Sequence, residues 1–331
     1  MSKQTKNSSS NSSPLPLVIV NPKSAAGSTR EKWSAIASDL RSHFGPFQAA
    51  FTRCPGDGIR IASNAAKEGR RFLIACGGDG TINEVANGII LSGQDAELGI
   101  FPSGTGGDFR RTIGMPSSSR DAARALKFGR TQAIDVGKVT FLDDKDQNQV
   151  RYFLNESSFG LAADIISRVK TSSALKWVPI DSVRGTASFA LSTLQEVVGL
   201  ETVFVRVKID GGDEKTVSTV NFSIANARYF GGGMMIAPDA KLSDGFFDIV
   251  NIGDIRTAKI ILNAYTLYRG THMKLPEVKS RPARKIEISP ADEHRPILLE
   301  IDGELPGHLP AVFEVVPNAL RLRVPVSASF S

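Results

Sequence analysis

The sequence predicts an α/β domain built on a parallel sheet, followed by a second domain that is an antiparallel β-sandwich. Up to residue 134, short apolar runs alternate with segments of helical spacing, which is typical of a parallel sheet covered on both faces. From residue 135 onward the runs are short and β-rich, which favours an antiparallel sandwich. We therefore expect domains at residues 15–134 and 135–325, with a return of the C-terminal strand to the first domain left open. Residues 1–14 are rich in Ser and Asn and are expected to form a disordered tail.

The first half should contain four strands and four helices in alternation. We expect strands at residues 15–21, 47–52, 71–75 and 98–101, and helices at 29–44, 58–69, 82–91 and 121–128. Ser119 is the expected cap of the last helix. Because ligands of parallel sheets bind at the carboxyl ends of the strands, the turns that follow these strands are the first places to search for a site.

The second half should be mostly strands. We expect them at residues 134–141, 151–157, 203–209, 217–225, 247–252, 285–289, 297–302 and 312–316. Helices are expected at 183–198 and 257–268. The first of these has one broad apolar face, which is explained either by core packing or by a helix that borders a lipid entrance or touches a bilayer.

The charge balance restricts the partners. The chain has 331 residues and a net charge of +6, with an isoelectric point of about 9.3. Nucleic acid, an anionic membrane and a phosphate-bearing substrate all fit a basic protein. The basic cluster at Lys279, Arg281, Arg284 and Lys285 lacks interleaved aromatic residues, and no zinc or helix-turn-helix spacing is present. We therefore expect no nucleic-acid partner, and the cluster is either a solvated surface or a membrane-facing patch.

The sequence also bears on location. No run approaches the roughly 20 apolar residues of a membrane-spanning helix, and the N-terminus lacks the apolar core of a signal peptide. Cys54 and Cys76 lie in or beside expected buried strands, which favours reduced core thiols. We expect a cytoplasmic protein without a transmembrane segment, peripheral at the membrane. The oligomeric state stays open and includes a homodimer.

The turn Gly77-Gly-Asp-Gly-Thr81 is the most informative motif, because it lies between an expected strand and an expected helix. Its glycines let the backbone turn sharply and expose amides to a ligand. The following helix begins with unpaired N–H groups and a positive dipole, which bind phosphate. Asp79 adds a carboxylate suited to a metal ion, so the motif indicates a metal-bound nucleotide.

Three further turns hold candidate residues, each with a plainer structural explanation. Asn21 to Gly27 offers hydroxyl and amide donors but is equally an ordinary Asn-Pro turn. Residues 102–108 form a second glycine-rich loop, with a flexible linker as the alternative. Ile301-Asp-Gly-Glu304 places two carboxylates around a glycine, as a simple hairpin also would. In residues 238–245, Asp244 and nearby carbonyls could bind a hard cation.

Together these segments resemble the diacylglycerol kinase catalytic-domain family, which includes bacterial lipid kinases and sphingosine and ceramide kinases. The resemblance runs from about residue 15 to 325. The segments that match are Val20-Asn-Pro-Lys-Ser24, Gly77-Gly-Asp-Gly-Thr-Ile-Asn-Glu84, Pro102-Ser-Gly-Thr105 with Asp108-Phe109, Asn155-Glu-Ser-Ser-Phe-Gly160, Lys241-Leu-Ser-Asp-Gly245 and Ile301-Asp-Gly-Glu304.

The resemblance implies a phosphofructokinase-like nucleotide domain of the NAD kinase/diacylglycerol kinase type, followed by an antiparallel β-sandwich, with ATP bound between them. It implies that Asp302 is the general base and Glu304 its close companion. It implies a Mg²⁺ site at the carbonyls of Lys241 and Phe246 and the side chain of Asp244. The residues that it implies for ATP are Asn21, Pro22, Lys23, Ser24, Gly27, Thr52, Gly77, Gly78, Asp79, Gly80, Thr81, Asn83, Glu84, Gly104 and Thr105.

Two positions depart from the family pattern. Gly107 stands where the family usually has Asn, and Ala25-Ala26 stands where it often has Gly. Neither change removes a carboxylate, so an active enzyme is still expected.

The implied activity is transfer of the γ-phosphate of ATP to a primary hydroxyl of a membrane lipid, diacylglycerol-like or sphingoid/ceramide-like. Tyr229, Phe230 and Met234-Met235 line an acyl pocket in this hypothesis, or merely fill the core. One alternative is a soluble NAD kinase, whose phosphate turn also has the sequence Gly-Gly-Asp-Gly and whose short Asn-Glu motif has a counterpart in Asn155-Glu156. Another is a non-catalytic nucleotide- or lipid-binding protein.

Overall fold

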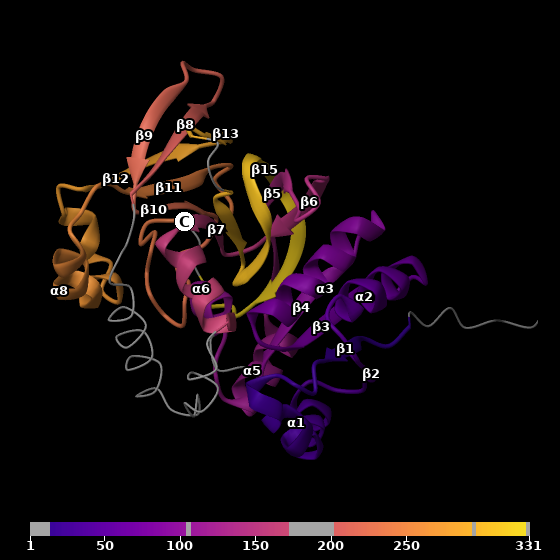
Figure 1. The fold of residues 1–331 in the computed structure, drawn as a ribbon. Helices are drawn as coiled ribbons and strands as arrows, with labels where there is room; N and C mark the ends of the chain where they lie inside the picture. The colour runs from indigo at the N-terminus through magenta and orange to yellow at the C-terminus, as the bar shows by residue number, and fades with distance from the viewer. Residues whose placement is uncertain (1–13, 104–106, 172–201, 293–295, 329–331) are drawn as a thin grey trace, which may run out of the picture.

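The computed structural model describes residues 14–103, 107–171, 202–292 and 296–328. Its first half is a parallel sheet of β1 (Leu17–Val20), β2 (Gln48–Phe51), β3 (Phe72–Gly77) and β4 (Glu97–Pro102), in the order β4-β3-β1-β2. Leu17 pairs in register with both Gln48 and Leu73. Helices α2 (Asp57–Lys67) and α3 (Asp79–Ser92) cover one face, and α1 (Ser28–His43) and α5 (Ser119–Phe128) cover the other (Figure 1). All of β1 is therefore buried, as the apolar run predicts.

The second half is an antiparallel sandwich, which confirms the predicted fold class. Its strands are β5 (Arg130–Leu142), β6 (Asn148–Phe153), β7 (Glu156–Gly160), β8 (Val203–Ile209), β9 (Lys215–Thr219), β10 (Asn221–Ala225), β11 (Phe247–Ile252), β12 (Val278–Ala283), β13 (Lys285–Pro290), β14 (Leu298–Ile301) and β15 (Glu304–Val324). Buried aromatic rings fill its core. Phe153 stacks on Phe247 with ring centroids 5.5 Å apart, and Phe159 on Phe222 at 5.2 Å.

The long strand β15 connects the two halves. It pairs antiparallel with β13, β14 and β5, and its end pairs parallel with β4 through Arg321 and Leu322. Register shifts between His308 and Ala311 and between Val316 and Leu320 let the strand bend from one half to the other. One continuous sheet therefore runs through the molecule, and the division between residues 134 and 135, inside β5, remains our proposal.

Several local predictions were wrong. The expected strands at 151–157 and 217–225 are each two strands, because the chain turns sharply between β6 and β7 and between β9 and β10. Strand β12 was missed because its lysine and arginine resemble part of a surface cluster rather than a strand. The short helix α4 (Asp108–Thr112), the helix α6 (Leu161–Thr171) and the 3₁₀ turns at Ala25–Gly27 and Thr271–Lys274 were also missed. The predicted helix at 257–268 is α8 (Thr257–Leu267), whereas that at 183–198 lies outside the described residues.

Two side chains also differ from expectation. Ser118 rather than Ser119 caps α5, since its hydroxyl accepts a hydrogen bond from the backbone N–H of Asp121 at 3.1 Å. Among adjacent serines the sequence pattern cannot choose the cap. Cys54 is exposed in the loop after β2, whereas Cys76 is buried in β3, where burial raises the pKa of its thiol to about 12. None of the helices in the described part of the chain has the length and apolar character that a bilayer crossing requires.

Candidate active site

The turns after β1, β3 and β4 meet at one edge of the parallel sheet. The side-chain amide of Asn21 donates to Oγ1 of Thr81 at 3.1 Å, which joins the first turn to the second. The hydroxyl of Thr29 donates to the carbonyl of Ser103 at 3.0 Å, and Ser24 lies against both residues. The described residues of the three turns are therefore joined at one edge of the sheet, as the parallel topology predicts.

The start of α3 is open to an anion. Its N-cap residue, Gly78, has no side chain to satisfy the helix, and the first intrahelical bond runs from Ile82 N–H to the Gly78 carbonyl. The amides of residues 79–81 precede that bond and form the positive end of the helix. A Cβ atom added at Gly80 would meet open space, so ligand atoms can approach the backbone there.

Asp79 and Asp108 form a carboxylate pair beside this turn. Both oxygens of Asp79 accept backbone N–H groups at the start of α4, from Asp108 at 3.1 Å and Phe109 at 3.0 Å. The buried Asp108 accepts from Arg111 at 2.9 Å and from the backbone N–H of Gly232 at 2.8 Å. Burial, and then the nearby charge of Asp79, raises the pKa of Asp108 to about 6. Asp79 therefore caps the start of α4, in addition to the metal-binding role predicted for it.

Gly107 explains one departure from the family pattern. Its φ of 66° lies in the left-handed region, and it forms the N-cap of α4. Asn is the residue that tolerates this conformation best after Gly, so the exchange keeps the backbone geometry. The neighbouring Gly104 and Thr105, both predicted ATP contacts, lie outside the described residues.

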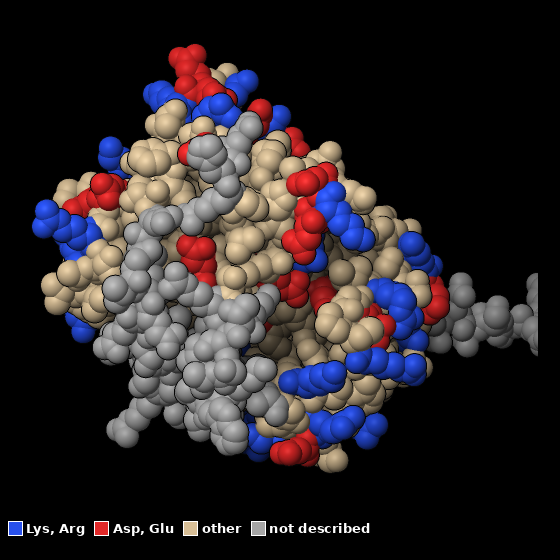
Figure 2. All heavy atoms as spheres, in the orientation of Figure 1, with Lys and Arg blue, Asp and Glu red and all other residues tan. Residues whose placement is uncertain are grey.

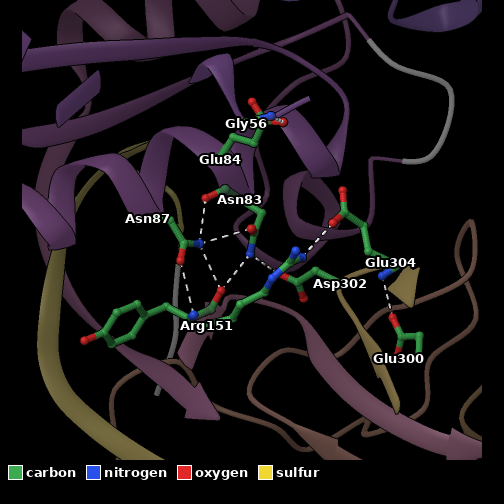
Figure 3. Close-up of polar contacts among 10 residues, drawn as sticks. Gly56, Asn83, Glu84, Asn87, Arg151, Glu300, Asp302 and Glu304 are labelled. Carbon is green, nitrogen blue, oxygen red and sulfur yellow. Dashed lines mark hydrogen bonds and ion pairs between the residues drawn. The ribbon is translucent and has the colours of Figure 1, made fainter. Parts of the chain in front are cut away.

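Asp302 lies at the tip of the hairpin between β14 and β15 and faces α3 (Figure 3). Both Asp302 and Gly303 have positive φ, which is the backbone of a two-residue type I′ hairpin. The side-chain amide of Asn83 donates to Oδ2 of Asp302 at 2.7 Å. The backbone N–H groups of Leu154, Asn155 and Glu156 donate to the same carboxylate at 2.8, 2.9 and 3.1 Å. The Asp-Gly turn is thus a hairpin and also holds a carboxylate in a fixed position.

Asn83 and Asn87 hold the opposite side of this arrangement. Both side chains donate to the carbonyl of Tyr152, at 3.0 and 2.9 Å, and Asn87 accepts from the backbone N–H of Tyr152 at 3.1 Å. Helix α3 is therefore fastened to the end of β6, next to the Asp302 hairpin (Figure 3). Asn87 was not predicted, although its position one helical turn after Asn83 was a usable signal.

The carboxyl group of Asp302 has a raised pKa. Burial is the largest cause and the charge of Glu300 adds to it, while the backbone donors oppose them, and the pKa reaches about 7. Such a value suits a general base at neutral pH, since the group is partly ionised and basic enough to accept a proton.

A second pair of carboxyl groups, Glu156 and Glu300, lies beneath Asp302. Their residues are 2% and 3% exposed. Glu300 accepts from the Ser158 hydroxyl at 2.7 Å and from the backbone N–H of Gly303. If Glu156 were ionised, its buried Oε2 atom would have no hydrogen-bond donor among the described residues. If it is protonated, its carboxyl group can donate to Glu300, and this state fits the structure better. Burial, then the charge of Glu300, raises the pKa of Glu156 well above its usual range. Sequence patterns did not single out this pair for a role.

Other predicted residues have definite positions. Glu304 is exposed and forms a 2.7 Å ion pair with Arg151 (Figure 3). Glu84 accepts the backbone N–H groups of Gly56 and Gly58, both at 2.8 Å, and so caps α2. Thr52 is buried at the end of β2 and bonded through its backbone to β1.

The first turn is held largely by its own contacts. The backbone N–H of Lys23 donates to the side chain of Asn21 at 3.0 Å, and the Ser24 hydroxyl donates to the Asn21 carbonyl at 2.8 Å. Ala25 and Gly27 both have positive φ, so a non-glycine residue occupies a left-handed position here. Pro22 and Gly27 supply the bend.

The predicted metal residues lie in the loop before β11. Asp244 accepts the backbone N–H of Phe246 at 3.1 Å. Burial, followed by the charges of Asp244 and Asp239, raises the pKa of Asp248 to about 6, while Lys241 opposes this. Crowded carboxylates and carbonyl oxygens fit a hard cation in donor type and charge. Among the residues that the structure describes, no three or more His, Cys, Asp or Glu side chains form a ready-made metal centre.

The surface has a hollow between the two halves of the molecule. Figure 2 shows acidic side chains on one rim of this hollow and lysine and arginine side chains on the other.

Comparisons with known proteins agree with this architecture. The family profile described as the diacylglycerol kinase catalytic domain matches residues 16–139, and that described as the YegS C-terminal NAD kinase beta sandwich-like domain matches residues 159–324. A diacylglycerol kinase of Staphylococcus aureus strain JH9 is 30% identical over 258 residues, which are 78% of this chain and 76% of that protein. A diacylglycerol kinase of Mycobacterium tuberculosis strain H37Rv is 28% identical over 271 residues, covering 81% and 82%. A crystal structure of a diacylglycerol kinase from Bacillus anthracis strain Sterne has the same fold, with a TM-score of 0.69 at 23% identity over 95% of this chain and 98% of that chain.

Proposed function

Because the chain belongs to the diacylglycerol kinase family, we propose that it transfers the γ-phosphate of ATP to the primary hydroxyl of a membrane lipid. Kinases of this family use ATP. For this chain we propose in addition which residues bind ATP, where the metal binds and which lipid accepts the phosphate. A diacylglycerol-like lipid is our first candidate acceptor, since the similar proteins carry that name, and a sphingoid or ceramide-like lipid is the second.

The observation that supports this proposal most is the position of Asp302 relative to α3. Asn83, which donates to Asp302, lies one helical turn from Asp79 at the start of the helix. A helix rises about 6 Å over those four residues. A phosphate held at the start of α3 and a hydroxyl held at Asp302 would therefore be close enough for direct transfer.

In the proposed reaction, Asp302 accepts the proton of the lipid hydroxyl as its oxygen attacks the γ-phosphorus. The bond between the γ-phosphorus and the bridging oxygen breaks, and ADP leaves. The turn at residues 77–81 holds the phosphates through its amides, with Asn21, Ser24 and Thr52 around the rest of the nucleotide. Phosphoryl transfer requires mainly that the reacting groups are positioned and that the phosphate charge is neutralised. These residues would position the phosphates.

Magnesium would supply charge neutralisation at the phosphates when bound. We assign Asp79 to its vicinity, and we assign a second, structural cation to the carbonyls of Lys241 and Phe246 and the carboxylate of Asp244. The support for this cation is the type of donor in the loop, because carboxylate and carbonyl oxygens are the ligands that hard cations prefer.

An NAD kinase activity is the main competing function, because the chain shares its phosphate turn and an Asn-Glu pair. In this chain the backbone N–H of Asn155 donates to Asp302, and the carboxyl group of Glu156 is buried beside Glu300. Neither of these two groups is therefore open to a ligand. This arrangement favours a lipid kinase.

The direct test is incubation of the purified protein with γ-labelled ATP, Mg²⁺ and either a mixed lipid extract or NAD. We expect a labelled phospholipid and no labelled NADP. Labelled NADP would overturn the proposal in favour of an NAD kinase. ATP binding without any transfer to either acceptor would favour a non-catalytic binding protein.

A further inference from the structure

Helix α8 has an apolar face that the fold leaves in solvent. Leu262 is 73% exposed and Tyr265 is 61% exposed, and Leu267, on the far side of the helix from both, packs against the protein. Ala258 and Arg269 continue the exposed side, one turn before and one turn after. We call these four residues the α8 face. Large exposed apolar side chains usually occur singly, so two adjacent ones on one short helix need an explanation.

Basic residues outnumber acidic ones in and around α8. Between residues 254 and 279 the chain has five basic residues and two acidic ones. Lys259 is engaged by Glu277, and Arg256, Arg269, Lys274 and Lys279 are exposed. Figure 1 shows α8 at the outer edge of the molecule, and Figure 2 shows lysine and arginine side chains along the same edge. An apolar strip with basic residues near it matches the surface of an anionic bilayer.

The α8 face is also connected to the candidate active site. The backbone N–H of Met235 donates to the carbonyl of Leu267 at 2.8 Å, and in the same loop Gly232 donates to Asp108 at 2.8 Å. Tyr268, at the end of α8, has a raised pKa, first through burial and then through the charge of Asp108. A surface that holds α8 would therefore hold a lipid on the side of the protein that contacts Asp108, at the start of α4.

We propose that the α8 face docks the protein on an anionic lipid bilayer, with Leu262 and Tyr265 inserted at the interface and Arg269 among the headgroups. This rests on the proposed function for its purpose, since a bilayer would present the acceptor. A second copy of the chain is a poorer occupant. The two side chains expose on the order of 300 Å² together, whereas a stable protein interface needs roughly 800 Å² on each partner.

The test uses the full chain and vesicles of phosphatidylcholine, with or without 30% phosphatidylglycerol as a chosen probe (on the order of physiological anionic content). We compare wild type with Leu262→Glu/Tyr265→Glu and with Phe128→Glu, a matched control because Phe128 is 65% exposed at the end of α5. We expect co-sedimentation of wild type and Phe128→Glu with anionic vesicles, and at least tenfold weaker binding of the double variant. Arg269→Glu should weaken binding only to the vesicles with phosphatidylglycerol.

Two further measurements keep this result separate from the kinase proposal. Turnover of a short-chain, monomeric form of the acceptor should be equal in all variants, and vesicle binding is scored whether or not any lipid is phosphorylated. Wild-type binding by the double variant would overturn the proposal, as would a wild type that ignores vesicles. A lowered Tm of the double variant would overturn the proposal in favour of a face that is covered by protein. So would a wild type that sediments as a dimer while the double variant sediments as a monomer.

Discussion

The side-chain amide of Asn83 donates a 2.7 Å hydrogen bond to the carboxylate of Asp302, and the two residues are 219 positions apart in the chain. This bond joins the helix that follows the phosphate turn to the hairpin that bears the proposed base. It connects the parallel half of the molecule to the sandwich half at the point where the reaction would occur.

Asn83→Ala should lower kcat without preventing ATP binding. The hydrogen bond involves a charged acceptor, and bonds of this kind contribute about 1.5–3 kcal/mol, which corresponds to a loss of about 10- to 100-fold. Steady-state kinetics and nucleotide titration measure the two effects. Ser92→Ala is the control on the same helix, because its hydroxyl bonds only to the nearby backbone of Ile89 and Gln94, away from Asp302. A kcat within twofold of wild type would remove Asn83 from this role.

Activity should rise with pH through about 7. The pKa of Asp302 is raised to about 7 by burial, so the carboxylate that accepts the proton becomes populated only near and above that pH. A profile of kcat/KM against pH measures this directly. An acidic limb near pH 4, the ordinary range of an aspartate, would contradict the assignment of Asp302 as a base with a raised pKa.

Glu156→Gln should leave the folded protein at least as stable as wild type. An amide can donate to Glu300 in place of the carboxyl proton, and it has no charge to bury. Because the pKa of Glu156 is raised on folding, its contribution to stability is complete below the ordinary value of 4.5 and is lost as pH rises towards the folded-state value.

Thermal unfolding of both proteins across that range provides the check. The difference in Tm, variant minus wild type, should increase as pH rises. A variant that becomes relatively less stable with rising pH would mean that Glu156 is ionised in the fold. Glu287→Gln is a control on an exposed strand residue.

Gly107→Asn should be tolerated, whereas Gly107→Ala should weaken ATP use. Gly107 has a left-handed backbone, which costs roughly 1–2 kcal/mol for Ala and less for Asn. An added Cβ would lie 3.0 Å from Nε of Arg110 in both variants, so this contact does not separate them and the flexible Arg110 side chain must move slightly in each. Values of kcat/KM for ATP in the two variants test this. Equal losses in both would show that the side chain itself, and not the backbone conformation, limits the loop.

The parallel half was predictable because its signals are local. Apolar runs, helical spacing and glycine turns each lie within a few residues, and the topology then places Asn21, Gly77 and Ser103 on one edge. The hairpin at Asp302 was predictable as a turn from its Asp-Gly sequence alone. Its function was suggested only by the family resemblance, since nothing local to residues 301–304 refers to α3.

The other features of the fold and the site could not be predicted, because they depend on contacts between segments that are distant in the sequence. Glu84 belongs to the phosphate motif in sequence, but its side chain turns to the start of α2, because Gly56 and Gly58 present backbone donors there. Glu156 and Glu300 are ordinary strand residues until β7 and β14 are paired, and only the pairing buries them together. Strand β12 does not resemble a strand in sequence, because it lies at the end of the sheet and its four middle residues, which include Lys279 and Arg281, are all exposed.

The proposed reaction requires Asp302 as the proton acceptor. The substitution Asp302→Asn tests this requirement. Asn tolerates the positive φ of this turn, and its one oxygen can still accept from Asn155 and Glu156, although its NH2 group then faces the N–H of Leu154. The amide cannot act as a base, and thermal unfolding of the variant checks that it folds. Transfer of labelled phosphate from ATP to lipid should fall by at least about 100-fold, the usual contribution of general base catalysis, while ATP binding in a titration stays within about twofold. Transfer at the wild-type rate by the folded variant would contradict the account.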